Sequence, residues 1–562
     1  PTMQMTGAQI IIECLAEQGT DVVFGFPGGA VLPLYEALYH NQHRIKHILT
    51  AHEQGASHAA DGYARSTGKV GVCISTSGPG ATNMVTGIAT AYMDSVPMVA
   101  LTGNVTLPLL GKDSFQEVDI TGITMPITKH NYIVKDVTML AQTIRDAFRI
   151  AQEGRPGPVL IDIPKDVTVH TTDYVFQKPL PISPRTERLS EENLDMALAM
   201  IEESERPMLY VGGGVIRGKA SEELGTFVDL IDAPVCTSLM GCGAISSYNE
   251  RFTGMVGMHG SKVSNMCVSA CDLLVVVAAR FSDRVVSKAS GFAQNARIIH
   301  IDVDPAEIDK NIKSFCHVIG DVKVVLSELN KRITKPHTNE KWMDQVRSYK
   351  LRYPIRFDNE SQRAKTILKS LQKVLPPEFF IVTEVGQHQM WAAQFLKHVQ
   401  PGHFLTSGGL GTMGYGTGAA IGAQVGNPKS RVVNVAGDGS FGMNCNELAT
   451  IARYNLPVII LLMNNHTLGM VRQWQTLFFD NHYSETTLDG GVDWMVLAQA
   501  YGIQGRKIGL DDDPRQILQE ALDANAPCVI ECEIPMDDKA YPMVAPGASI
   551  DDMLGVGELG DY

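Results

Sequence analysis

Two oxygen-bearing side chains follow neighbouring apolar runs in the last third of the sequence. Asp438 lies in a Gly-Asp-Gly turn after the run 432–435, and Asn465 follows the run 458–463. If both runs are adjacent parallel strands, their carboxyl ends meet at one sheet edge, which is where open α/β sheets bind ligands. A carboxylate, an amide oxygen and a nearby main-chain carbonyl suit Mg²⁺ that shares a diphosphate with its ligand. The pattern therefore predicts a magnesium–diphosphate site.

A glycine-rich segment lies just before this pair. Residues 408–414 contain the pattern GxGxxG after an extended stretch at 404–407. A dinucleotide site of the nicotinamide type needs an acidic residue at the end of the next strand to bind a ribose hydroxyl. That strand ends in Asn434-Val435, so a loop that holds a diphosphate beside Mg²⁺ fits the sequence better. A nicotinamide dehydrogenase is the alternative that this motif leaves open.

Glu53 is the candidate in the first part of the chain. It follows the apolar run 47–49 and precedes the helix-like segment 57–65. An acid at such a junction usually caps a helix or lies in solvent, and only its neighbours favour a catalytic role. The segment 77–83, Ser-Gly-Pro-Gly-Ala-Thr-Asn, follows the run 70–74 and opens a helix. Its backbone N–H groups are expected to form a second ligand-facing edge.

The elements that must position these residues alternate along the chain. Short β-branched apolar runs are separated by helix-like segments, which is typical of parallel sheets covered by helices. A helix is expected at 140–151, because its apolar residues recur on one face and Gly154 follows where a helix would end. The runs expected to be strands are 70–74, 98–102, 159–163, 208–211, 273–277, 298–301, 379–383, 432–435 and 458–463. We therefore predict an α/β protein.

Two polar stretches interrupt this alternation. The first, 171–193, contains three prolines, and the second, 331–362, is charged and poor in apolar residues. Both are predicted to be linkers between domains. The resulting α/β domains are 1–170, 190–335 and 363–535, followed by a tail, 536–562, that is rich in Gly, Pro and Asp. Three domains suit a chain of 562 residues at about 150 residues per domain.

The composition excludes several classes of protein. The chain has 47 basic and 61 acidic residues, a net charge of −14, and 44% apolar residues. This argues against a disordered chain and against a nucleic-acid or anionic-membrane surface. Every apolar stretch is shorter than the roughly 20 residues of a membrane crossing. With no secretory signal at 1–20 and no metal-type cysteine spacing, we expect a cytoplasmic protein with buried free thiols.

Together these segments resemble the thiamine diphosphate enzymes, and within them the acetohydroxyacid synthase (acetolactate synthase) large subunits. The similarity covers essentially the whole chain. Its motifs are Phe-Pro-Gly-Gly-Ala at 26–30, His-Glu-Gln-Gly at 52–55, Thr-Ser-Gly-Pro-Gly-Ala-Thr-Asn at 76–83, Phe-Gln-Glu at 115–117, Gly-Arg-Pro-Gly-Pro at 154–158, Pro-Lys-Asp at 164–166, Gly-Gln-His-Gln-Met-Trp at 386–391, Gly-Asp-Gly at 437–439 and Gly-Met-Val at 469–471. The resemblance implies two thiamine-diphosphate-binding domains, one for the pyrimidine and one for the diphosphate and Mg²⁺, around a central FAD-binding-type domain.

The resemblance also implies a reaction. Pyruvate loses carbon dioxide, and the remaining two-carbon unit is joined to a second 2-keto acid, either pyruvate or 2-ketobutyrate. The products are acetolactate or acetohydroxybutyrate, at the first common step of valine, leucine and isoleucine synthesis. The implied catalytic residues are Glu53, which activates the aminopyrimidine ring, and Gly29, Phe115, Gln116 and Lys165 around the reaction space. The implied ligands of Mg²⁺ are Asp438, Asn465 and the main chain of Thr467, and Arg284 and Trp474 would recognise the acceptor.

Cofactor contacts follow from the same resemblance. Those to thiamine diphosphate are Gln387, His388, Met413, Gly439, Ser440 and Met470. Those to FAD, a structural flavin in this family, are Arg155, Gly212, Gly213, Gly214, His259, Arg280, Asp302 and Asp321. The chain departs from the usual pattern at Asn104 (commonly Gln), Met125 (Arg), Ala279 (Gly), Ser282 (Asp) and Thr417-Gly418 (Leu-Pro).

The resemblance implies a homodimer or homotetramer, 2-keto acids as substrates, and a separate regulatory small subunit as a possible partner. Three related readings stay open: a pyruvate oxidase, a glyoxylate carboligase and a flavin-free catabolic acetolactate synthase. Glu53 argues against the carboligase, and Arg280-Phe281 with Asp283-Arg284 argues against the flavin-free enzyme. A catalytically inactive scaffold is a further alternative, which the intact motifs disfavour.

Overall fold

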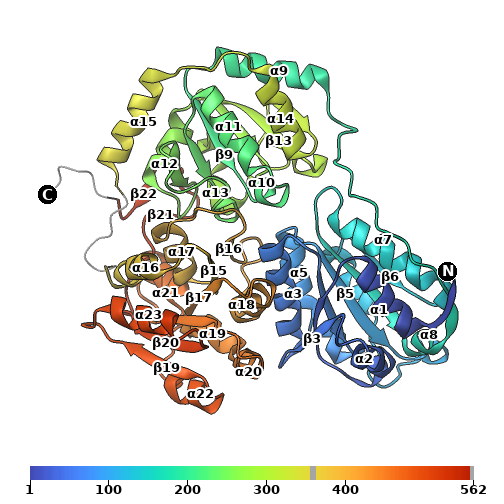
Figure 1. The fold of residues 1–562 in the computed structure, drawn as a ribbon. Helices are drawn as coiled ribbons and strands as arrows, with labels where there is room; N and C mark the ends of the chain where they lie inside the picture. Colours follow the sequence, from blue (N-terminus) through green and yellow to red (C-terminus); the bar gives the residue numbers. More distant parts are fainter. Residues whose placement is uncertain (355–361, 557–562) are drawn as a thin grey trace.

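Three lobes, each built on one parallel six-stranded sheet, make up the computed structural model (Figure 1). It describes residues 1–354 and 362–556. Parts of the second predicted linker (355–361) and of the predicted tail (557–562) therefore lie outside the described residues. The N-terminal lobe is blue and cyan in Figure 1, the central lobe green and yellow, and the C-terminal lobe orange and red. The predicted α/β class with parallel sheets is confirmed.

The N-terminal sheet has the strand order β3-β2-β4-β5-β7-β6. Its strands are β2 (Val22–Gly25), β3 (Lys46–Leu49), β4 (Gly71–Ser75), β5 (Met98–Asn104), β6 (His130–Ile133) and β7 (Pro158–Pro164). Its helices are α1 (Gly7–Glu17), α2 (Leu32–Tyr39), α3 (Glu53–Thr67), α4 (Pro79–Thr82), α5 (Val85–Met93), α6 (Ile120–Thr124), α7 (Leu140–Gln152) and α8 (Lys165–Val169). The three central strands are buried along their whole length, which explains why continuous apolar runs located them.

The predicted helix 140–151 is α7, and its buried residues are those expected on its apolar face. Gly154, which follows the helix, has a φ of +61°, so the chain turns there in a conformation that glycine adopts without steric cost. This turn returns the chain directly into β7 and places Arg155 at the edge of the N-terminal lobe.

The central sheet has the order β11-β10-β9-β12-β13-β14. Its strands are β9 (Pro207–Val211), β10 (Val235–Thr237), β11 (Phe252–Met255), β12 (Leu273–Val277), β13 (Arg297–Asp302) and β14 (Cys316–Ile319). Its helices are α9 (Glu191–Glu203), α10 (Gly214–Arg217), α11 (Ser221–Ile231), α12 (Lys262–Ala270), α13 (Asp283–Val286), α14 (Val322–Arg332) and α15 (Glu340–Arg352).

The C-terminal sheet has the order β16-β15-β17-β18-β20-β19. Its strands are β15 (Phe379–Thr383), β16 (Phe404–Leu405), β17 (Arg431–Gly437), β18 (Ile459–Asn464), β19 (Gln504–Ile508) and β20 (Cys528–Glu533). Its helices are α16 (Gln362–Val374), α17 (Gln387–Phe395), α18 (Tyr415–Gly426), α19 (Asp438–Met443), α20 (Leu448–Arg453), α21 (Gly469–Phe478), α22 (Trp494–Ala500) and α23 (Pro514–Asp523).

Helices α3 and α18 join the N-terminal and C-terminal lobes and lie side by side (Figure 1). Their backbones approach so closely that only glycine fits at two crossing positions. A Cβ at Gly62 would lie 2.1 Å from Ala419 O, and a Cβ at Gly422 would lie 1.8 Å from Ala59 O. Both helices are largely buried, and they continue one apolar core between the two sheets. The two lobes therefore form one packed unit within the chain.

Both predicted linkers contain regular structure. The first begins with β8 (Thr171–Tyr174), which pairs antiparallel with β1 (Met3–Thr6) at the start of the chain. The second contains α15, which docks on the central lobe through buried Trp342 and Val346. Trp342 Nε1 donates to the carbonyl of Pro207 at 2.8 Å. A few apolar residues at helical spacing are enough to anchor a helix whose other residues are mostly charged or polar.

The last described residues return to the central lobe. Strands β21 (Met543–Val544) and β22 (Met553–Leu554) pair antiparallel. Val544 N donates to Met258 O at 2.7 Å, and Asn265 Nδ2 donates to Ile550 O at 2.8 Å. The described part of the predicted tail thus covers the loop that carries Met258.

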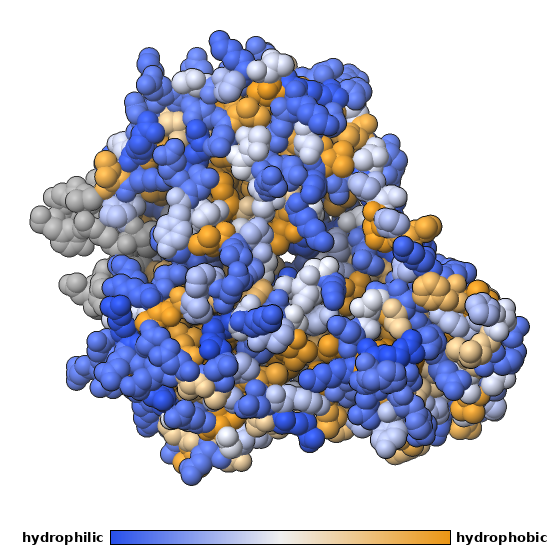
Figure 2. All heavy atoms as spheres, in the orientation of Figure 1, coloured by the Kyte–Doolittle hydropathy of each residue, from blue (hydrophilic) through white to orange (hydrophobic). Residues whose placement is uncertain are grey.

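Hydrophilic side chains dominate the face seen in Figure 2, with apolar side chains scattered among them. Within the described ranges, no helix combines the length and apolar character needed to cross a membrane. All ten cysteines are free and all but Cys445 are buried, as the sequence predicted.

Candidate active site

A small hollow opens at the carboxyl edge of β17 and β18. The register pairs Gly437 with Met463, so Asp438 and Asn465 emerge at the same edge. The hollow has a volume of about 80 Å³. It brings together every cofactor and metal residue predicted in this lobe: Gln387, His388, Met413, Asp438, Gly439, Ser440, Asn465, Thr467 and Met470. We call it the C-terminal hollow.

A chain of hydrogen bonds fixes the orientation of the Asn465 amide. Gln387 Nε2 donates to Gln473 Oε1 at 2.9 Å and to the carbonyl of Asp538 at 2.8 Å. Gln387 therefore presents its oxygen to Asn465, whose Nδ2 donates to it at 3.1 Å. This contact turns Asn465 Oδ1 toward the other two predicted metal ligands.

Three oxygen atoms converge as a result. Asn465 Oδ1 lies 3.1 Å from Asp438 Oδ1 and 2.9 Å from the carbonyl oxygen of Thr467. Rotating the amide would turn both contacts into hydrogen bonds, but it would also set the amide oxygen against Gln387 Oε1. Burial raises the pKa of Asp438 to about 6, because it disfavours the charged carboxylate. A bound cation would stabilise that charged form. The donor set, one carboxylate, one amide and one carbonyl, fits Mg²⁺.

The opposite side of the hollow fits an anion. His388 Nε2 is buried and has no hydrogen-bond partner in the described part of the chain. Burial lowers the pKa of His388 to about 3, so its ring is neutral at pH 7. Gly437 leaves room for that ring, because a Cβ there would lie 2.5 Å from His388 Nδ1. An unpaired ring nitrogen beside three converging oxygens suits a diphosphate that bridges to the metal.

Glu53 is the first residue of α3 and is 9% exposed. Asn83 Nδ2 donates to Glu53 Oε1 at 3.2 Å. Glu53 Oε2 faces the α4 turn, where a Cβ at Gly80 would lie 3.2 Å from it. The predicted glycine-rich segment 77–83 therefore does reach Glu53, and Asn83 is a contact that the sequence did not single out.

The other predicted catalytic residues lie at the ends of elements in the N-terminal lobe. Gly29 begins a short 3₁₀ helix, and Lys165 begins α8. Phe115 is 87% exposed, and Gln116 has a φ of +57°. The C-terminal hollow is lined, among the described residues, only by residues between Val385 and Val471. One chain therefore does not place Glu53 or Phe115 in that hollow.

The predicted acceptor residues do meet. Arg284, from α13, lies over the ring of Trp474, from α21. Arg284 Nη1 also contacts Met258 Sδ at 3.2 Å. Trp474 packs with Met258, Tyr541 and Met543 in a small apolar cluster, so the tail strands cover part of the indole, whereas Arg284 is exposed.

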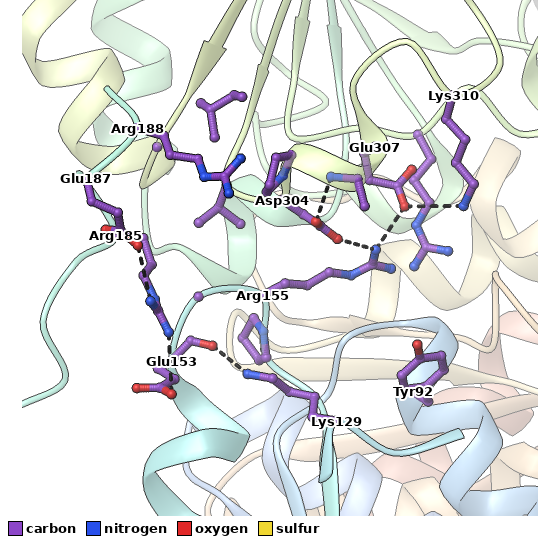
Figure 3. A pocket seen from close by; sticks show the side chains of 18 of the residues that line it. Tyr92, Lys129, Glu153, Arg155, Arg185, Glu187, Arg188, Asp304, Glu307 and Lys310 are labelled. Carbon is purple, nitrogen blue, oxygen red and sulfur yellow. Dashed lines mark hydrogen bonds and ion pairs between the residues drawn. The ribbon is translucent and has the colours of Figure 1, made fainter. Parts of the chain in front are cut away.

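A larger cavity of about 640 Å³ lies between the N-terminal and central lobes (Figure 3). Arg155 reaches across it and pairs with Asp304 Oδ2 at 3.3 Å and Glu307 Oε1 at 3.0 Å. On the other side, Arg185 pairs with Glu153 and Glu187. The wall of this cavity is thus charged, and two of its arginines, Arg155 and Arg185, already pair with carboxylates.

A second cavity of about 330 Å³ adjoins it. Five residues predicted to contact FAD line it: Arg155, Gly214, Arg280, Asp302 and Asp321. Gly212, Gly213 and His259 are not among its lining residues. His259 lies instead by the tail, where the backbone at Ala540 and Pro542 faces its ring. The five lining residues form a cluster; the other three are not in contact with this space.

The second cavity suits a diphosphate-containing ligand. Arg217, which the sequence analysis missed, lines it as well. In the described part of the chain, Arg217 and Arg280 have no carboxylate partner. Burial and the neighbouring Arg155 and Arg280 lower the pKa of Arg217 to about 10. Arginines beside Gly214 that make no direct ion pair fit the anionic part of FAD. A basic residue three positions after a glycine-rich turn was the signal available in the sequence.

Comparison with known families agrees with this geometry. Residues 5–123 match the family described as "Thiamine pyrophosphate enzyme, N-terminal TPP binding domain". Residues 194–329 match the central domain of these enzymes, and residues 384–532 match their C-terminal TPP binding domain. These matches cover more than half of the chain, which belongs to the thiamine pyrophosphate enzymes and has their two domains for binding thiamine diphosphate.

Similar curated proteins narrow the family. The acetolactate synthase large subunit of Cyanidium caldarium is 44% identical, over 98% of this chain and 97% of the relative. The acetolactate synthase isozyme 2 large subunit of Escherichia coli (strain K12) is 44% identical, over 98% of this chain and 99% of the relative. The acetolactate synthase large subunit of Parasynechococcus marenigrum (strain WH8102) is 46% identical, over 98% of this chain and 91% of the relative. Within its family, the chain groups with the acetolactate synthase large subunits.

Proposed function

We propose that this chain catalyses the decarboxylating condensation of pyruvate with a second 2-keto acid, at the first common step of valine, leucine and isoleucine synthesis. Pyruvate as the acceptor gives 2-acetolactate, and 2-ketobutyrate gives 2-aceto-2-hydroxybutyrate. The relatives that bear the name of this activity match 98% of the chain. When bound, thiamine diphosphate supplies the carbanion chemistry that amino-acid side chains lack.

The observation that best supports this function is the fixed orientation of Asn465. Gln387 holds the amide so that its oxygen joins Asp438 Oδ1 and the Thr467 carbonyl. A carboxylate, an amide and a main-chain carbonyl at one sheet edge are ligands that suit Mg²⁺, so this donor set favours Mg²⁺ as the resident ion. His388, Gly439 and the other residues of the C-terminal hollow would then hold the diphosphate.

We assign cofactor activation to Glu53. Asn83 holds one of its oxygens, and the other accepts no hydrogen bond within the described chain. A buried carboxylate held in this way can take up and return a proton at Oε2. Phe115 would exclude water from the reaction space, and Gln116 and Lys165 would orient the substrate carboxylates.

The cavities between the N-terminal and central lobes are assigned to FAD. Arg155, Arg280 and Gly214 line one continuous space with Asp302 and Asp321. Decarboxylation and carbon–carbon bond formation need no net electron transfer, so the flavin's place in this enzyme is structural.

The assembly that we propose is a homodimer or a homotetramer. Glu53 does not line the C-terminal hollow of its own chain, and a complete site would combine Glu53 of one copy with the hollow of a second. Phe115, which is 87% exposed, would then be covered by that copy. The relatives are named large subunits, which supports a small regulatory subunit as a further partner.

The direct test is incubation with pyruvate, thiamine diphosphate, Mg²⁺ and FAD. One carbon dioxide and one acetolactate are expected for every two pyruvates consumed. Acetate or acetyl phosphate formed with peroxide would instead identify a pyruvate oxidase, and would overturn the proposal.

A further inference from the structure

A buried carboxylate that the proposed reaction does not use lies directly behind the C-terminal hollow. Glu384 follows β15 and is fully buried, with 0% exposure. In the described part of the chain its carboxylate has no Lys, Arg or His partner, although its backbone bonds the His388 ring. Burying a carboxylate without a cation is energetically unfavourable unless hydrogen-bond donors satisfy its oxygens. The position of these donors therefore indicates the role of Glu384.

Those donors come from the turn at Gly414, the first turns of α18 and α19, and strand β17, where Asn434 Nδ2 donates to Glu384 Oε1 at 3.4 Å. Glu384 Oε2 accepts from Gly414 N at 3.1 Å and from Ser440 Oγ at 2.8 Å. Glu384 Oε1 accepts from Thr417 N at 3.0 Å and from the Thr417 hydroxyl at 3.3 Å. Thr417 therefore binds this oxygen through both its backbone N–H and its hydroxyl.

Two of these donors belong to the predicted cofactor segments. Gly414 follows Met413, and Ser440 lies two residues after Asp438. The chain from Glu384 itself continues to Gln387, which orients the metal-side amide. A single carboxylate therefore ties together three of the segments that line the hollow.

Ser440 reinforces this arrangement. Its Oγ also accepts from Gly414 N at 3.1 Å and from Val385 N at 3.2 Å, so the three segments are cross-linked twice. The space is filled as well: a Cβ at Gly416 would lie 2.9 Å from Glu384 Oε1. Glu384 cannot shift without moving the turn that carries Met413.

We propose that Glu384 is the positioning residue of the cofactor site: it holds the Met413 turn and the Asp438 helix start at the separation that thiamine diphosphate and Mg²⁺ require. This rests on the proposed function, since it assumes that the hollow binds that cofactor. Glu384 does not touch the cofactor; it acts through Gly414, Thr417 and Ser440.

The test compares two buried carboxylates. Glu384→Gln keeps the shape of the side chain but sets an amide NH₂ against backbone or hydroxyl donors. The control, Glu17→Gln, removes the charge of a buried carboxylate in the N-terminal lobe that pairs with Arg145. For each protein, the dissociation constants of thiamine diphosphate and of Mg²⁺ are measured by quenching of tryptophan fluorescence. The melting temperature is measured without cofactors.

Both variants are expected to melt below the wild type. Only Glu384→Gln is expected to bind thiamine diphosphate more weakly, by roughly tenfold or more, because hydrogen bonds to a charged acceptor are lost. An unchanged dissociation constant in a folded Glu384→Gln protein, or equal weakening in Glu17→Gln, would overturn the inference. If the wild type itself binds no thiamine diphosphate, the proposed function is what fails.

If Glu384→Gln does not fold, Glu384→Asp takes its place. Aspartate keeps the charge but is one methylene shorter, so it cannot reach both Gly414 and Thr417. Weaker binding of thiamine diphosphate is again expected, and wild-type affinity would contradict the assignment.

Discussion

The guanidinium of Arg284 lies over the indole ring of Trp474, with Cζ 5.4 Å from the ring centroid. The two residues come from different lobes, so this contact closes the C-terminal lobe against the central lobe. The charged group is available for a carboxylate, whereas the indole offers an apolar face. Together they provide the two kinds of contact needed to recognise a 2-keto acid.

Acceptor choice should depend on Trp474. The two acceptors differ by one methylene, which an apolar surface discriminates by only about 1 to 3 kcal/mol. Trp474→Leu is expected to reduce the preference for 2-ketobutyrate and to leave pyruvate homocoupling mostly intact. Competition between the two keto acids measures the product ratio directly.

Arg284→Ala provides the matched comparison, because a guanidinium binds the carboxylate of either acid. It is expected to weaken the use of both acceptors. If Trp474→Leu leaves the product ratio unchanged, Trp474 only packs against Met258 and the tail.

Glu53→Gln should keep the fold but lose turnover. Loss of a positioned proton-transfer group typically costs about 10²- to 10⁴-fold, and the amide still fits beside Asn83. Exchange of the C2 proton of bound thiamine diphosphate, followed by NMR, checks this step without product formation. Exchange at the wild-type rate would show that Glu53 has no such role.

Activity should reappear when two inactive variants are mixed. Glu53→Gln inactivates only the part of the site in the N-terminal lobe, and Asp438→Ala inactivates only the C-terminal hollow. If each complete site combines two chains, a mixed dimer contains one intact site and one site with both changes, so half of the sites in mixed dimers are restored. No recovery, in spite of demonstrated subunit exchange, rules out the shared site.

The metal requirement should depend on the amide at 465. Asn465→Ala removes one of three converging oxygens, and we expect the Mg²⁺ concentration for half-maximal activation to rise by roughly tenfold. Asn330→Ala, in α14 of the central lobe, is the control and should leave it unchanged. Equal Mg²⁺ requirements in all three proteins would remove Asn465 from the ligand set.

Particular residues show how far the sequence predicted this structure. The strand runs were located to within two residues because central parallel strands are apolar on both faces. Asp438 and Asn465 were paired because the carboxyl ends of parallel strands share an edge, a relationship that depends on topology alone. Every residue predicted for the C-terminal hollow lies there.

Other features depend on contacts that no local pattern encodes. The sequence predicts a linker where the structure has helix α15, since its few apolar residues indicate a helix only when the central lobe offers a surface for Trp342. The roles of Gly212, Gly213 and His259 toward FAD stay predictions, because these residues do not line the cavity. Glu384 and Arg217 were missed, because their partners come from distant segments.

The central claim is a carboligation that requires thiamine diphosphate and Mg²⁺ and is not an oxidation. The most direct test is product analysis with pyruvate plus 2-ketobutyrate, with thiamine diphosphate, Mg²⁺ and FAD each omitted in turn, while oxygen is monitored. We predict acetolactate and acetohydroxybutyrate, loss of both without thiamine diphosphate or Mg²⁺, and no oxygen consumption in proportion to pyruvate. Oxygen uptake or peroxide stoichiometric with pyruvate, without either hydroxy acid, would contradict the account.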